Sequence, residues 1–188
     1  MKLPFKGPKI FRMIYLRVIL VLVTLSVAVG CDTKQGVKIG DTPPGFSGTD
    51  ITGEFVSLSQ FKGKVVVLYF WTNSCCGDRL KLLEPFYREN KQRGLAVLAI
   101  NVGDTKETVE SYVKNNTLTF SFQTDEHKMI SGHYGVFGFP TIFILDRNGV
   151  IREKILGNIP EDKLEKLIQR QFDIQKQVEA SYEKNHPR

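Results

Sequence analysis

Two adjacent cysteines, Cys75 and Cys76, are the residues of this chain best suited to do chemistry. They follow the apolar, β-branched run 65–71, which is typical of a buried strand, and a helical pattern begins directly after them. A cysteine at a helix start has its thiolate stabilised by free backbone N–H groups and by the helix dipole. The stretch therefore predicts a reactive thiol at a strand-to-helix junction.

The elements that must position these cysteines alternate along the chain. The patterns predict strands at 65–71, 95–102, 120–123, 141–145 and 150–156, and helices at 79–93, from 104, at 126–134 and from 160. Strands that alternate with helices indicate a sheet with parallel strands, covered by helices on both faces, and the last two strands add an antiparallel hairpin. Turn residues around short apolar pairs in 41–64 predict a small β-hairpin before the first long strand.

Two helix details follow from local chemistry. Pro85 lies inside the helical pattern of 79–93, where it removes a backbone donor, so we expect a kink in the first half of that helix. Asp104 and Glu107 form a D-x-x-E variant of the capping box, so we expect Asp104 to cap the next helix.

The charge of the chain is concentrated at its N-terminus. The formal net charge is +6, but residues 1–30 hold five basic residues and no acidic one, which leaves 21 basic residues against 20 acidic ones. The remainder shows no basic stretch interleaved with aromatic residues, as a nucleic-acid groove would require. We therefore expect no nucleic-acid partner.

The N-terminus has the parts of an export signal. A basic segment through Arg17 precedes the apolar run 18–29, whose 12 residues fall short of the roughly 20 needed to cross a bilayer. Residues 26–31 resemble a bacterial lipobox, with Ala28 where that pattern prefers leucine. We expect a signal peptide at 1–30, lipidation of Cys31 and a linker at 31–40; an uncleaved N-terminal anchor is the alternative. Either arrangement tethers the domain to a membrane, outside the cytoplasm.

Five segments resemble, in order, the TlpA/ResA-like branch of the thioredoxin superfamily, namely 40–46, 58–64, 69–71, 101–103 and 134–141. Members of that branch are membrane-anchored, extracytoplasmic thiol-disulfide oxidoreductases, related in fold to the AhpC/TSA peroxiredoxins. The resemblance implies an α/β thioredoxin-like fold with a central mixed sheet at 41–172, after which 173–188 form a C-terminal helix extension and tail. It implies a thiol or disulfide of an extracytoplasmic protein, or a small thiol, as partner, and no cofactor.

The resemblance also carries over roles for individual residues. Cys75, four residues after Trp71, matches the attacking cysteine of the family. Pro140 matches the cis-proline that faces the cysteines, and Phe139 before it matches the residue whose backbone binds an extended substrate peptide. Trp71 is expected to pack in the core beside the site.

The chain departs from the family at the second cysteine of the C-x-x-C motif, where Asp78 stands. A carboxylate cannot resolve a mixed disulfide as a thiol does. Asp78 and Arg79 also act in opposite directions on the pKa of Cys75. Cys76 is the remaining candidate for the resolving thiol. Adjacent Cα atoms lie about 3.8 Å apart, below the usual disulfide range of about 4.4 to 6.8 Å, so a Cys75–Cys76 bond would be strained and readily reducible.

Other functions remain open from the sequence. Residues 74–77 resemble the S-x-C-G site of glutathione peroxidases, with Cys76 as the peroxidatic residue. The peroxiredoxin pattern P-x-x-x-T-x-x-C instead ends on Cys75; Thr72 matches its threonine, and Leu68 stands in place of its proline. A peroxidase is therefore one alternative.

A catalytically degenerate binding domain is the other alternative. The two cysteines and Asp78, with His127 or His133, offer ligand types found in copper sites, but the C-x-x-x-C spacing of the related Sco-type copper proteins is absent. We therefore expect no metal.

Overall fold

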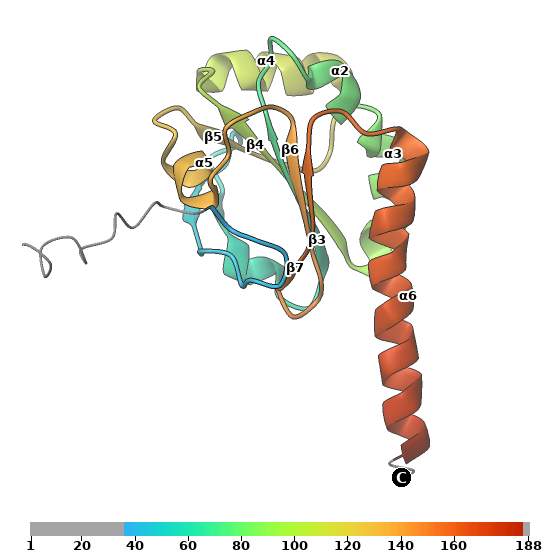
Figure 1. Ribbon diagram of the computed structural model, residues 1–188. Helices are drawn as coiled ribbons and strands as arrows, with labels where there is room; N and C mark the ends of the chain where they lie inside the picture. The colour runs from blue at the N-terminus through green and yellow to red at the C-terminus, as the bar shows by residue number, and fades with distance from the viewer. Residues whose placement is uncertain (1–35, 186–188) are drawn as a thin grey trace, which may run out of the picture. The chain divides into compact units, whose positions relative to one another are not determined.

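A five-stranded mixed sheet forms the centre of the protein, whose computed structural model describes residues 36–185. Its strands are β3 (Val65–Trp71), β4 (Leu95–Val102), β5 (Ser121–Asp125), β6 (Thr141–Leu145) and β7 (Ile151–Leu156). The spatial order is β5-β4-β3-β6-β7, with β3, β4 and β5 parallel and β6 and β7 antiparallel to their neighbours (Figure 1). The predicted mixed sheet and its closing antiparallel hairpin are confirmed.

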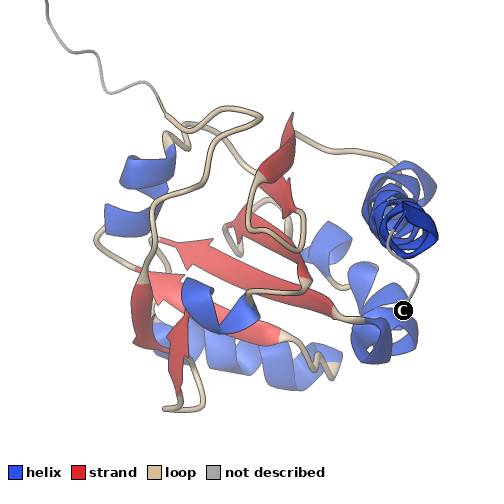
Figure 2. Cartoon of the chain, turned by 90° about the horizontal axis from the view of Figure 1, so that it is seen from below, coloured by secondary structure: helices blue, strands red, loops and turns tan. Residues whose placement is uncertain are grey.

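Helices cover both faces of this sheet (Figures 1 and 2). The helices are α2 (Gly77–Leu80), α3 (Leu83–Asn90), α4 (Lys106–Asn116), α5 (Met129–Tyr134) and α6 (Glu161–Asn185), with 3-10 turns at Leu58–Phe61 and Lys91–Arg93. Side chains of α2, α3, α4 and α6 pack on one face, and those of α5 on the other. A separate antiparallel pair, β1 (Ser47–Thr49) and β2 (Phe55–Ser57), is the predicted N-terminal hairpin.

Strand β3 is buried on both sides, which explains its unbroken apolar sequence. Because side chains alternate along a strand, Val67, Tyr69 and Trp71 enter the core under α3 and α6, while Leu68 and Phe70 enter the core under α5. The strand therefore ends on a side chain that belongs to the same core as the helices following it.

The helix predicted at 79–93 is two helices, α2 and α3, separated by Lys81 and Leu82. Both residues keep helical backbone angles, but three-residue hydrogen bonds, from Leu82 N to Arg79 O and from Glu84 N to Lys81 O, interrupt the α-helical pattern there. Pro85 is the third residue of α3, where its missing N–H would have no intrahelical acceptor. The predicted irregularity is present, but it precedes the proline.

The predicted cap of α4 is wrong. Thr105, not Asp104, is the N-cap residue, and its hydroxyl oxygen accepts a hydrogen bond from Thr108 N at 3.4 Å. The carboxylate of Asp104 instead accepts hydrogen bonds from Asn73 and Asn101. A tertiary contact thus replaces the local one.

The helix predicted at 126–134 begins three residues later, at Met129. Lys128 has a positive φ of 56°, which interrupts the helical path. The Asp125 carboxylate accepts hydrogen bonds from Ile130 N at 3.1 Å and Ser131 N at 2.7 Å. The end of β5 therefore supplies the acceptors for the first turn of α5.

The N-terminal part of the described chain runs along the outer edge of β7. Gly40 N donates to Ile151 O at 2.8 Å, and Ile151 N donates to Asp41 O at 2.9 Å. Further towards the N-terminus, Gly36 packs against the backbone of Gly135 at the end of α5. The segment thus pairs with the first residue of β7, at the edge of the sheet where another chain could pair.

Replacing Gly135 with alanine is expected to lower the free energy of unfolding by about 2 kcal/mol or more. Gly135 has a positive φ of 64°, and an added Cβ would overlap the backbone of Gly36. Gly132→Ala is the matched control in the same helix, because nothing lies near its added methyl group; it should leave stability unchanged or raise it by up to about 1 kcal/mol. Equal urea midpoints for the two variants would contradict this close backbone packing.

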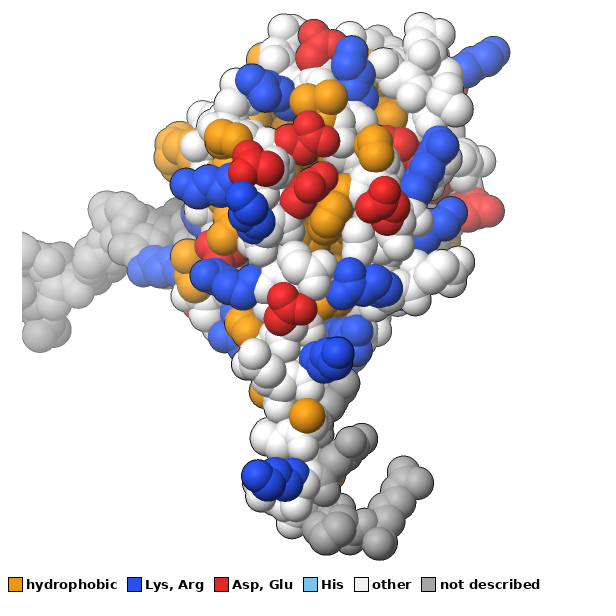
Figure 3. Space-filling view, turned by 90° about the vertical axis from the view of Figure 1, so that its right-hand side faces the viewer, with side chains coloured by type: hydrophobic (Ala, Val, Ile, Leu, Met, Phe, Trp, Pro, Cys, Tyr) orange, Lys and Arg blue, Asp and Glu red, His pale blue; other side chains and the backbone are white. Residues whose placement is uncertain are grey.

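Helix α6 continues past the last of its buried apolar side chains. Leu164, Ile168 and Phe172 belong to the core, whereas Ile174 and Val178 are exposed. Acidic and basic side chains are interspersed on the side of the molecule that carries α6 (Figure 3), so that side has no continuous basic surface. Within residues 36–185, none of the helices combines the length and apolar character that crossing a bilayer requires. The expected signal segment 1–30 and the first half of the expected linker, Cys31 included, lie outside the described residues.

Candidate active site

The two cysteines lie in a tight turn between β3 and α2. The carbonyl of Thr72 accepts hydrogen bonds from Cys75 N at 3.5 Å and Cys76 N at 3.3 Å. The carbonyl of Cys76 then accepts from Arg79 N and Leu80 N, both at 3.1 Å, which starts α2. The turn stands at the carboxyl end of β3, the edge at which ligands usually bind to sheets with parallel strands.

A disulfide joins Cys75 to Cys76, whose Cα atoms are 3.8 Å apart. Cys76 is only 1% exposed and belongs to the core, whereas Cys75 is exposed. The two sulfurs therefore differ in access, and a thiolate arriving from solvent meets Cys75.

The exposed sulfur has a hydroxyl beside it. Thr72 Oγ1 donates to Cys75 Sγ at 3.3 Å and lies 3.2 Å from Ser74 Oγ. A hydrogen bond donated to sulfur favours the thiolate over the thiol. Thr72 can therefore stabilise negative charge on Cys75 when the disulfide opens.

The Phe139–Pro140 peptide bond is cis, as the resemblance implies. The ladder between β3 and β6 pairs Phe70 with Thr141, so Pro140 lies beside the end of β3. Its carbonyl accepts a hydrogen bond from Gly157 N at 2.8 Å, and Phe139 is half-buried against both cores. The loop before β6 thus reaches the same edge of the sheet as the cysteine turn.

Trp71 is fully buried at the end of β3. Its ring packs against Tyr112, at a centroid distance of 4.7 Å, and against Phe122, at 6.2 Å. Its indole Nε1 has no hydrogen-bond partner in the described part of the chain. These contacts agree with the packing role predicted for Trp71.

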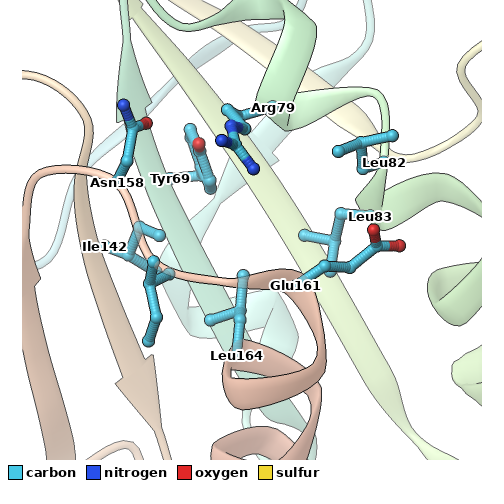
Figure 4. A pocket seen from close by; sticks show the side chains of 9 residues that line it. Tyr69, Arg79, Leu82, Leu83, Ile142, Asn158, Glu161 and Leu164 are labelled. Carbon is cyan, nitrogen blue, oxygen red and sulfur yellow. The ribbon is translucent and has the colours of Figure 1, made fainter.

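Asp78 and Arg79 point to different surroundings. Asp78 is exposed and forms an ion pair with Lys81 at 2.7 Å; the hydrogen bond and the charge of Lys81 both lower the pKa of Asp78. Arg79 lines a small pocket with Tyr69 and Asn158, above apolar side chains of β6 and α6 (Figure 4). The carboxylate at position 78 is thus paired with a lysine at the surface.

Tyr69 faces that pocket with its hydroxyl group (Figure 4). Burial raises the pKa of Tyr69 to about 12, and the charge of Arg79 acts in the opposite direction. The hydroxyl is therefore neutral at physiological pH, where it can donate a hydrogen bond but cannot serve as a base.

Tyr69→Phe is expected to make the stability of the domain less sensitive to alkaline pH. The ordinary pKa of 10.0 applies to the unfolded chain and about 12 to the folded one, so only the unfolded chain loses this proton between those values. Tyr69 therefore lowers the free energy of unfolding as pH rises from 10 to 12, by at most about 3 kcal/mol. Urea unfolding of both proteins at pH 8 and pH 11 measures the difference; identical pH dependence would contradict the shift.

Three residues of the site were not recognised from the sequence. Asp104 accepts hydrogen bonds from Asn73 N and Asn101 Nδ2, both at 2.8 Å, and the Tyr112 hydroxyl donates to Gly77 O at 2.6 Å. Asn101 lies near the carboxyl end of the neighbouring parallel strand β4, and Asp104 comes two residues after that strand ends, so strand order could have indicated them. Tyr112 gave no signal beyond helical spacing.

His127 and His133 do not contribute to the cysteine turn. His127 and His133 are both exposed, near and within α5. Among residues 36–185, no three His, Cys, Asp or Glu side chains are grouped so as to hold a metal ion.

Comparison with known proteins agrees with this geometry. The family model of the AhpC/TSA family matches residues 39–154. The thiol-disulfide oxidoreductase ResA of Bacillus cereus is 32% identical over 161 residues, which cover 81% of this chain and 93% of that protein.

Two solved structures have the same fold. A crystal structure from Chlorobium tepidum, assigned as a thiol:disulfide interchange protein DsbE, has a TM-score of 0.67 and 30% identity, and covers 73% of this chain and 99% of its own. A thiol:disulfide interchange protein from Bacteroides sp. has a TM-score of 0.63 and 25% identity over 72% of this chain and 91% of its own. The chain therefore belongs to the AhpC/TSA family and, within the thioredoxin fold, to the ResA-type thiol-disulfide oxidoreductases.

Proposed function

We propose that this protein exchanges thiols and disulfides through Cys75, with Cys76 as the second sulfur of its own redox pair. The observation that carries the proposal is the disulfide between these residues, in which one sulfur is exposed and the other is buried. An exchange centre needs this asymmetry, because one sulfur must meet the substrate while the other leaves and returns.

The reaction begins when a substrate thiolate attacks Cys75 Sγ. A bond forms between these two sulfurs, the Cys75–Cys76 bond breaks, and its electron pair stays on Cys76 Sγ, which takes up a proton. A second substrate thiolate then attacks the substrate sulfur of the mixed disulfide and releases Cys75 as a thiolate. Two substrate thiols leave as one disulfide, and the protein holds two thiols; the same steps in reverse reduce a substrate disulfide.

Cys76 acts as the resolving thiol, which the C-x-x-C motif would place at position 78. The Asp78 carboxylate is paired with Lys81 at the surface and cannot form a sulfur bond. Cys76 is already bonded to Cys75. The redox pair then consists of two adjacent cysteines, whereas the C-x-x-C motif has two cysteines three residues apart.

The loop before β6 supplies the substrate contacts. The cis bond before Pro140 and the backbone of Phe139 lie at the edge of the sheet that carries the cysteine turn, as substrate binding by an extended peptide requires. Phe137, two residues earlier, is 82% exposed and offers apolar surface on the same loop. The substrate is a thiol or disulfide of an extracytoplasmic protein, or a small thiol.

The location follows from the N-terminal sequence. Residues 1–30 act as a signal peptide, Cys31 carries the lipid anchor, and 31–40 link it to the thioredoxin-like domain at 41–172, after which 173–188 extend the last helix. The protein is then a membrane-anchored lipoprotein on the extracytoplasmic side. A mass increase on Cys31 in protein purified from membranes tests this part, and a free Cys31 thiol there would contradict it.

Exchange itself is tested by mixing the oxidised protein with dithiothreitol near neutral pH and following alkylation of both cysteines. We expect both sulfurs to become alkylated and the reduced protein to reduce a disulfide-containing peptide. A Cys75 that stays unreactive in the folded protein would contradict the proposal and favour a domain that only binds partners.

A thiol peroxidase is the second candidate, because Thr72 Oγ1 donates to Cys75 Sγ in the T-x-x-C arrangement of peroxiredoxins. In that reaction the Cys75 thiolate attacks hydrogen peroxide: an S–O bond forms, the O–O bond breaks, and the leaving hydroxide takes up a proton to become water. The Cys76 thiol then attacks the sulfur of the sulfenic acid, a second water leaves, and the disulfide forms. Trapping of sulfenic acid on Cys75 with dimedone after peroxide treatment of Cys76→Ser, which lacks the thiol that would consume it, supports this candidate, and its absence there excludes it.

A further inference from the structure

We propose that Tyr112 and Asp104 are positioning residues that hold the cysteine turn, residues 72–77, from both ends and so determine which sulfur a substrate can reach. The inference rests on the thiol-disulfide exchange proposed at Cys75. Asp104 lies between β4 and α4, Tyr112 lies in α4, and neither belongs to the cysteine motif.

Tyr112 of α4 holds the C-terminal end of the turn. Its hydroxyl donates to the carbonyl of Gly77 at 2.6 Å, and its ring packs against Trp71. The same carbonyl accepts Lys81 N at 3.2 Å, so Tyr112 adds a second donor to the first turn of α2. Gly77 directly follows Cys76, and its position therefore limits how far Cys76 can move.

Gly77 has no backbone reason to be glycine. It is not among the glycines with positive φ, so an L-residue could adopt its conformation. An added Cβ, however, would lie 2.8 Å from Tyr112 Cε2. The missing side chain is therefore explained by the ring of Tyr112, which occupies that space and can approach the backbone closely enough to bind its carbonyl.

Asp104 holds the N-terminal end of the turn. Its Oδ2 accepts a hydrogen bond from Asn73 N at 2.8 Å, two residues before Cys75. Asn101, fully buried and paired with Trp71 in the ladder, fixes Asp104 through two hydrogen bonds, from Asn101 Nδ2 at 2.8 Å and from Asp104 N to Asn101 Oδ1 at 3.1 Å. The carboxylate is thus held by the strand next to β3.

These anchors matter most when the disulfide is open. Reduction removes the covalent link between the two sulfurs, and only non-covalent contacts then fix the turn. With both ends held, Cys76 stays in the core and Cys75 remains the sulfur that substrates meet. Without Tyr112 or Asp104, the turn can rotate Cys76 towards solvent, so both sulfurs become open to attack.

Competitive alkylation of the reduced full-length protein tests this inference. Limiting iodoacetamide, followed by trypsin cleavage after Lys64 and Arg79, gives one peptide with both cysteines, whose fragments report the labelling ratio. We expect Tyr112→Phe to raise the share of label on Cys76 about three- to tenfold. This factor corresponds to the free energy of the one hydrogen bond that the variant loses. The phenylalanine ring keeps the packing on Trp71.

Tyr87→Phe is the matched control. Tyr87 is half-buried in the same core, with its ring 5.7 Å from that of Phe120, and its hydroxyl makes no hydrogen bond within residues 36–185. The Tyr87→Phe variant should show the same ratio of label on Cys76 to label on Cys75 as the unmodified protein. Asp104→Ala should behave like Tyr112→Phe, whereas Asp104→Asn, which keeps an oxygen acceptor, should restore the original ratio at least in part.

The outcomes separate this inference from the proposed function. A labelling ratio unchanged in both Tyr112→Phe and Asp104→Ala, with Cys75 still exchanging, overturns the positioning role and leaves the function intact. Failure of Cys75 to react in the unmodified protein overturns the function itself. Thermal unfolding of each variant is recorded first, and should Tyr112→Phe be unfolded, the Asp104→Ala and Asp104→Asn pair decides the matter alone.

Discussion

Cys75→Ser is expected to lower the rate of thiol-disulfide exchange by at least roughly a thousandfold, because a hydroxyl replaces the sulfur that forms the mixed disulfide. Cys75 is the exposed member of the pair, and the buried Cys76 is shielded from substrate. The rate is measured as reduction of a disulfide-containing peptide by the reduced protein. The fold should be preserved, since the substituted side chain lies at the surface.

Cys76→Ser should fail differently. In this variant Cys75 still attacks a substrate disulfide, but no adjacent thiol can release the bound substrate sulfur. A mixed disulfide between Cys75 and the substrate therefore accumulates. Asp78→Asn, in the first turn of α2, is the matched control, with a rate within about twofold of the unmodified protein, because Asp78 is exposed and paired with Lys81. Exchange that survives Cys75→Ser but not Cys76→Ser would reverse the two assigned roles.

Trp71→Ala is expected to lower the free energy of unfolding by about 3 to 5 kcal/mol, which is the usual result of truncating a buried aromatic side chain to alanine. The side chain is fully buried and fills the space between Tyr112 and Phe122. Domains of this size are stable by only about 5 to 15 kcal/mol, so this single change removes a large fraction. It also removes the surface on which Tyr112 rests.

Urea unfolding followed by circular dichroism measures this loss. Trp71→Phe is the comparison, because it keeps an aromatic ring and removes the indole N–H, which has no partner among residues 36–185. Its loss should be clearly smaller than that of the alanine variant. A change below about 1 kcal/mol for Trp71→Ala would show that the cavity collapses and that Trp71 does not support the turn.

The sheet and the place of the cysteines could be predicted from the sequence. An unbroken apolar run such as 65–71 is compatible with a strand buried on both faces, and the alternation of strands and helices fixes a parallel centre. Both signals are local or periodic, and for that reason they can be read without tertiary information. These two signals predict the strand-to-helix junction at Cys75.

The contacts that hold the turn could not be predicted. Asp104 has the spacing of a helix cap, but a hydrogen bond to Asn73, 31 residues earlier in the chain, takes its carboxylate. Tyr112 reaches Gly77 across 35 residues. Competition between a local and a distant partner depends on the packed structure, and so does the choice between a free and a bonded Cys76, which the sequence left open.

The most direct test is mass spectrometry of the tryptic peptide 65–79, which contains both cysteines, after digestion without reductant. The tryptic peptide from the oxidised protein should weigh two hydrogens less than the same peptide with two free thiols. Brief treatment of the oxidised protein with a limiting amount of a thiol-containing substrate peptide should attach the substrate peptide to Cys75. Two free cysteines after oxidation, or a substrate peptide attached only to Cys76, would contradict exchange through an exposed Cys75 and a buried Cys76.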